Sequence, residues 1–120
     1  HAPDNWQFKA DYVPDYEALI VSFRKVNPAA KIYVCLPTPC FPGRWGINNK
    51  TIHDEIIPLV RQVAKDTGAS VIDLNTPFAG KPELLSSDGV HPNVAGAKLM
   101  AGIIYHVLTG KVVASKTIRD

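Results

Sequence analysis

Long apolar stretches and blocks of like charge are both missing from this 120-residue sequence. No run approaches the ~18 apolar residues of a transmembrane helix, so the sequence predicts no membrane span. The 13 basic and 11 acidic residues give a net charge of +2, and the basic residues are scattered. We therefore expect neither a nucleic-acid-binding nor a membrane-binding surface. The chain opens with His1 rather than methionine, and we expect that an upstream segment was removed or left out.

Cysteine is scarce, and the two that occur, Cys35 and Cys40, bracket Leu-Pro-Thr-Pro. A zinc site needs about four ligands, and the sequence has no second cysteine pair and no close histidine pair. A C-x-x-C redox motif, a G-x-G-x-x-G segment and a P-loop are absent as well. We therefore expect no metal and no cofactor. The cysteines are interpreted as structural thiols, with a local disulfide as the alternative.

Helical and strand-like patterns alternate along the chain. Apolar residues at helical spacing predict a helix from Val13 to Val26. Lys31 to Leu36 is short, rich in β-formers and almost wholly apolar, which predicts a strand buried on both faces. A second helical pattern runs from Ile52 to Val63, and Pro58 inside it predicts either a kink or a late start.

Val71 to Leu74 reads as a second buried strand, and a polar loop continues from Asn75 to Ser87. The last helix carries apolar residues along one side and ends near Gly110. Strands that alternate with helices predict an α/β fold with a parallel sheet. Residues 1–120 fit one domain, but two strands are too few for such a sheet. We therefore interpret the chain as the C-terminal half of a doubly wound domain.

A histidine follows an acid by three residues in Asp88-Gly-Val-His91-Pro. The loop that holds them comes after the second strand, and ligands of open parallel sheets bind beyond the carboxyl ends of the strands. A carboxylate that accepts the Nδ1 proton of a histidine orients the ring as a general base. The alternative is a plain Asp-Gly turn, with His91 or Asn93 capping the last helix.

The segment D-G-V-H-P-N-x-x-G-A, residues 88–97, resembles the C-terminal block of the SGNH (GDSL-type) hydrolases. The segments K-I-Y-V-C-L-P-T-P, W-G-I-N-N and V-I-D-L-N-T-P are similar to members that act on acetylated sugars, and the resemblance runs from Asn5 to Gly110. It implies a flavodoxin-like three-layer parallel sheet and a serine esterase acting on acylated carbohydrate. Asp88 and His91 would then be two members of its catalytic triad.

The resemblance also implies that the family's serine and oxyanion-hole residues lie upstream of His1. Ser86 and Ser87 are too close in sequence to His91 to replace that serine. We expect the chain alone to be inactive and to need the N-terminal half of the same domain as its partner, or else to self-associate. The glycan-acting relatives also suggest secretion or a periplasmic location.

Trp45 lies in the proline-rich loop after the first strand, where it could stack on a sugar ring; the alternative is a loop anchor in the core. Arg44 beside it could meet a carboxylated substrate or remain a solvated charge. Two rival interpretations stay open. The chain could be a non-catalytic flavodoxin-like domain that binds a sugar or nucleotide, or an inactive fragment that folds only with a partner chain.

Overall fold

The computed structural model describes residues 3–113. In chain order the helices and strands are α1 (Pro3–Trp6), α2 (Tyr12–Val26), β1 (Tyr33–Leu36), α3 (Asn49–Thr51), α4 (Ile57–Thr67), β2 (Ser70–Asp73) and α5 (Val94–Thr109). Short 3₁₀ turns cover Lys9–Asp11, Thr76–Phe78 and Pro82–Leu84, and a π-helical turn covers Ile52–Ile56. No helix within the described residues is long and apolar enough to cross a bilayer.

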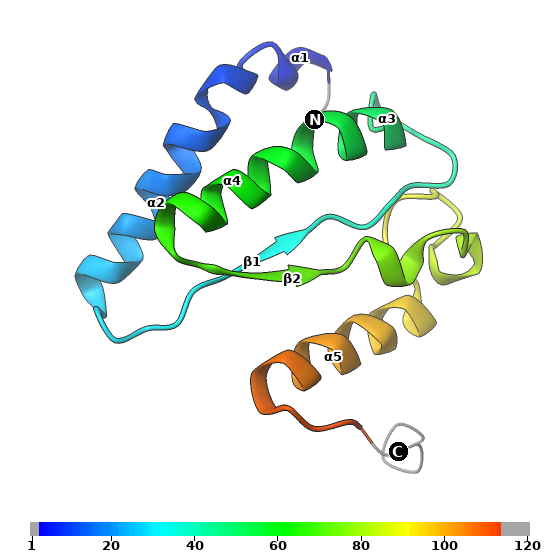
Figure 1. Ribbon diagram of the computed structural model, residues 1–120. Coiled ribbons are helices and arrows are strands. Elements are labelled where there is room, and N and C mark those ends of the chain that lie inside the picture. Colours follow the sequence, from blue (N-terminus) through cyan, green and yellow to red (C-terminus); the bar gives the residue numbers. More distant parts are fainter. Residues whose placement is uncertain (1–2, 114–120) are drawn as a thin grey trace.

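The two strands form one parallel pair, as the alternation of elements predicts. Leu36 at the end of β1 pairs with Asp73 at the end of β2. The loops that follow both strands therefore leave from the same edge of the sheet. Figure 1 shows α2 and α4 on one side of the sheet and α5 on the other.

The main core lies between the sheet and α4. Val34 and Leu36 of β1 are buried in one cluster with Val60 and Val63 of α4, and Ile20 of α2 joins them. Successive strand side chains point to opposite faces of a sheet. The α4 side of β1 is thus dry and well packed.

The other face of β1 is open, which corrects the prediction of a strand buried on both faces. Cys35, whose register partner is Ile72, is exposed, whereas Ile72 itself is buried. The difference arises because α5 packs against β2. A strand with one bare face and one unpaired edge is unusual for a parallel sheet, which is normally covered on both faces.

The helices match their predicted positions, but their apolar faces are only partly covered. In α2, Ile20 is buried, whereas Leu19, Phe23 and Val26 of the same predicted stripe are exposed. In α5 only Gly96 is fully buried, and Val94, Tyr105, Val107 and Leu108 are exposed. The helical period predicted the helices correctly, and within the described residues parts of their apolar faces remain uncovered.

Pro58 is accommodated by a late start of α4. Asn48 caps the preceding turn, where its side chain accepts a 2.8 Å hydrogen bond from the N–H of Thr51. The π-helical turn follows, and Pro58 then stands in the first turn of α4, where its missing N–H costs least. Gly68 ends the helix with a positive φ of 71°.

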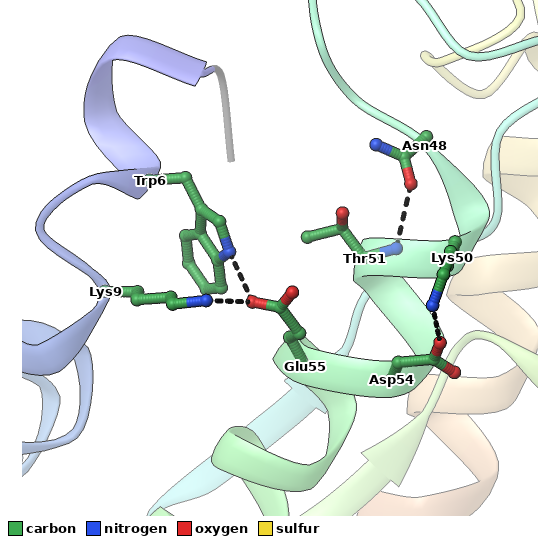
Figure 2. Close-up of polar contacts among 7 residues, drawn as sticks. All are labelled: Trp6, Lys9, Asn48, Lys50, Thr51, Asp54 and Glu55. Atoms are coloured by element: carbon green, nitrogen blue, oxygen red, sulfur yellow. Dashed lines mark hydrogen bonds and ion pairs between the residues drawn. The ribbon is translucent and has the colours of Figure 1, made fainter.

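Glu55, on the π-helical turn, ties the N-terminal segment to the helical run that continues into α4 (Figure 2). Its Oε2 accepts a 2.7 Å hydrogen bond from the indole N–H of Trp6 and lies 3.0 Å from Nζ of Lys9. The Trp6 hydrogen bond, followed by that of Lys9, holds the pKa of Glu55 below its ordinary value. Trp6 also packs edge-on against Tyr12. Trp6 therefore anchors the N-terminal segment.

Candidate active site

Asp88 and His91 form a hydrogen-bonded pair. Nδ1 of His91 lies 2.6 Å from Oδ2 of Asp88. The other carboxylate oxygen accepts three hydrogen bonds, from the N–H of Val90 at 2.8 Å, the N–H of His91 at 2.9 Å and the hydroxyl of Ser86 at 2.8 Å. The carboxylate is thus held by four donors and oriented by the backbone of its own turn.

These contacts determine the protonation state of the pair. The backbone N–H of His91, then its ring, and then Val90 and Ser86 lower the pKa of Asp88 well below its ordinary value. An ionised carboxylate can only accept hydrogen bonds, so the shared proton lies on Nδ1 of His91. In the neutral imidazole Nε2 then carries the lone pair, and within the described residues it has no hydrogen-bond partner. The His91 side chain is 70% exposed, and that of Asp88 is 22% exposed.

The turn that carries the pair is closed at its base by backbone pairing. Ser86 donates its N–H to the carbonyl of His91 at 2.7 Å, and Leu85 and Pro92 form an antiparallel bridge. Asn93 then joins the turn to α5. Its Oδ1 accepts from the N–H of Gly96, and its Nδ2 donates to the backbone carbonyls of Glu83 and Leu85. Asn93 is therefore the helix cap that the alternative interpretation assigned, and it stabilises the turn as well.

The loop after β1 is held in place by the side chains of two asparagines. Asn75, a buried polar residue two positions after β2, donates from Nδ2 to the carbonyl of Pro37 at 2.9 Å. Asn49 exchanges two hydrogen bonds with the backbone of Cys40, at 2.9 and 2.8 Å. These amide side chains take the place of strand pairing, because the loop is too rich in proline to continue the sheet.

Trp45 is brought to the rim of this site. It is 57% exposed, so the alternative of a core anchor is wrong. Its ring centroid lies 6.4 Å from that of His91, with the two planes tilted by 58°. All three predicted site residues thus meet at the carboxyl edge of the sheet.

Sequence reasoning underestimated two residues of this site. Ser86 was weighed only as a nucleophile, whereas its hydroxyl donates to Asp88. Asn93 was weighed only as a cap, and its contacts with the carbonyls of Glu83 and Leu85 were not foreseen. The S-x-D spacing was the available signal, because a hydroxyl two residues before an aspartate is well placed to reach its carboxylate.

The described residues contain no cluster of three or more side chains able to hold a metal ion. Cys35 and Cys40 are both free thiols, so the structural-thiol interpretation holds and the disulfide alternative does not. The chemistry available at the site is therefore that of an oriented imidazole, a carboxylate and an exposed indole.

The chain is similar in sequence to a known esterase. The chain is 39% identical over 119 residues to an acetylxylan esterase of Xylanibacter ruminicola, and the match covers 85% of this chain and 25% of that protein. The chain thus spans about a quarter of that relative.

Solved structures agree on the fold. The esterase domain of the ORF1 protein of the zebrafish ZfL2-1 retrotransposon superposes with a TM-score of 0.71 at 25% identity, covering 86% of this chain and 60% of that chain. The acetyl xylan esterase Axe2 of Geobacillus stearothermophilus superposes with a TM-score of 0.58 at 24% identity, covering 85% and 50%. Residues 2–99 match the profile of the GDSL-like lipase/acylhydrolase family, and the chain therefore belongs to that family.

Proposed function

We propose that this chain is the C-terminal portion of a serine esterase that removes acyl groups, acetyl above all, from carbohydrate. The observation that carries the proposal is the 2.6 Å contact between His91 and Asp88, in a turn beyond the carboxyl ends of two parallel strands. It is supported by family membership and by the likeness to an acetylxylan esterase. In this proposal the serine nucleophile and the oxyanion-hole donors lie upstream of His1.

His91 would act as base and acid in turn. Its Nε2 takes the proton of the serine hydroxyl while the serine oxygen attacks the ester carbonyl. The proton then passes to the oxygen of the departing sugar, which leaves an acyl-serine. In the second half Nε2 takes a proton from water, the hydroxide displaces the serine, and the proton returns to the serine oxygen. Asp88 holds the ring and stabilises the imidazolium in both halves.

The N-terminal half of the same domain is the proposed partner. Within residues 3–113 the edge of β1 that faces away from β2 has no neighbouring strand, Cys35 is exposed on one face of the sheet, and α2 exposes Leu19 and Phe23. Further parallel strands at this edge would pair with β1, and the crossover helices that join them would cover the exposed face of the sheet, which together build a flavodoxin-like three-layer sheet. Self-association through the same edge is the alternative. A secreted or periplasmic location is proposed on the likeness to a glycan-acting relative alone.

The test is ester hydrolysis by the complete protein and its variants. We expect His91→Ala to lower turnover of acetylated xylo-oligosaccharide by about 10⁶-fold and Asp88→Asn by about 10⁴-fold. His53→Ala is the matched control, because His53 is exposed on the π-helical turn and lies outside the proposed site. Circular dichroism checks that each variant folds. Unchanged hydrolysis in a folded His91→Ala variant would remove the triad. Absence of hydrolysis by the unchanged complete protein would instead favour a non-catalytic sugar-binding domain.

A further inference from the structure

We propose that Arg44 selects substrates that carry a carboxylate, so that this site prefers acylated acidic glycans to neutral ones. The inference rests on the proposed function and concerns substrate choice at the same site. Three observations carry it: a strained hairpin tip, a guanidinium stacked on an indole, and the closeness of both to His91.

The loop after β1 contains a tight β-hairpin with two residues at its tip. Arg44 and Ile47 exchange both backbone hydrogen bonds, at 3.0 and 2.9 Å. The residues between them, Trp45 and Gly46, both have positive φ, 53° and 77°. Such a turn normally takes Asn, Asp or Gly, and a bulky aromatic residue there is strained. Backbone strain of this kind persists where the surroundings enforce it, and it clusters at functional sites.

The base of the hairpin is rigid. A Cβ at Gly43 would lie 2.4 Å from the carbonyl oxygen of Ile47, so the two arms approach as closely as glycine permits. Nδ2 of Asn48 donates to the carbonyl of Gly46 at 3.3 Å. The indole of Trp45 is thereby presented on a fixed backbone rather than on a loose loop.

Arg44 adds a cation to this platform. Its Cζ lies 4.8 Å from the centroid of the Trp45 ring. A guanidinium stacked on an aromatic face keeps its N–H donors in its own plane, where they can hold a carboxylate with two parallel hydrogen bonds. Within residues 3–113 no carboxylate forms an ion pair with Arg44. The cation is therefore available to an external anion.

The closeness of Trp45 to His91 links the Arg44 cation to catalysis. The Trp45 ring is 6.4 Å from the His91 ring, so an ester at His91 places its own sugar or the next one beside the indole. A carboxylate on that sugar would reach the stacked guanidinium. Both groups are solvent-exposed, and an exposed charge pair supports roughly a two- to fivefold preference, which salt weakens.

The experiment compares two acetylated xylo-oligosaccharides, one neutral and one bearing a uronic acid, as substrates of the complete protein. The measured quantity is the ratio of their kcat/KM values. We expect the unchanged protein to prefer the uronic acid substrate by roughly two- to fivefold and Arg44→Gln to bring the ratio close to one. Arg44→Lys keeps the charge without the planar fork and should retain part of the preference. Arg61→Gln, an exposed position on α4, is the matched control and should retain all of it.

An equal ratio in the unchanged protein and in Arg44→Gln would overturn the proposal, as would a preference that about 0.5 M salt leaves intact. Absence of hydrolysis of either substrate would count against the proposed function instead. In that case quenching of Trp45 fluorescence by the uronic acid oligosaccharide decides the role of Arg44. Weaker binding in Arg44→Gln would support the proposal, and equal binding would refute it.

Discussion

The backbone N–H of Phe41 donates a 2.7 Å hydrogen bond to the carbonyl oxygen of Gly89. This bond joins the loop after β1 to the turn that carries Asp88 and His91. The loop extends from there to Trp45, so the relative placement of the indole and the imidazole depends on this contact. The space at Gly89 is correspondingly tight, because a Cβ there would lie 2.1 Å from the carbonyl oxygen of Phe41.

Gly89→Ala should therefore destabilise the protein and separate the two loops. The new methyl group meets backbone, and φ is already +74°, so both a clash and left-handed strain arise. Gly80→Ala is the matched control, since Gly80 has a φ of +70° with open space around it. In urea unfolding of the complete protein we expect Gly89→Ala to lower the free energy of unfolding by about 1–3 kcal/mol more than Gly80→Ala does. If both variants lost the same free energy of unfolding, the loop that carries Phe41 would move away from residue 89 without destabilising the protein, which would contradict the prediction.

Acid should weaken the catalytic turn through Asp88. Its pKa is lowered in the folded protein, mainly by the backbone N–H and ring of His91. The stabilisation is thus present above the pKa of an unfolded aspartate, about 3.9, and is lost as the pH falls below it. The free energy of unfolding, measured with urea between about pH 6 and pH 3, should decrease less steeply on acidification in Asp88→Asn than in the unchanged protein. Asp15→Asn, at an exposed position of α2, should keep the steeper pH dependence of the unchanged protein. An equal pH dependence in the unchanged protein and both variants would contradict the role of Asp88.

Cysteine labelling should report whether an N-terminal half covers β1. Cys35 is exposed and Cys40 is buried, and desolvation raises the pKa of both thiols, so labelling near pH 8.5 is suitable. In the isolated chain Cys35 should react well before Cys40. In the complete protein the helices of the proposed N-terminal half should cover this face and slow the labelling of Cys35 by more than tenfold, as burial of a thiol does. Equal Cys35 rates in both would argue against coverage of this face, and Cys40 serves as the internal reference.

Local rules were enough to locate most of the elements. The apolar period placed α2 and α5, and glycine and proline marked the ends of helices. The pairing of Asp88 with His91 was also predictable, because the contact spans three residues and involves a single turn. Interactions this short depend on the sequence nearby rather than on the rest of the fold.

The features that the sequence did not predict depend on contacts between segments that are distant along the chain. The exposure of Cys35 and Phe23 depends on which elements cover β1 and α2, and a hydrophobic period cannot reveal whether its partner is present. The approach of Trp45 to His91 spans 46 positions and rests on Asn75 and on the Phe41–Gly89 bond. The sequence by itself determined the elements and the catalytic turn. The tertiary structure alone decided which loops meet around that turn, because loops without a period are positioned by specific backbone hydrogen bonds.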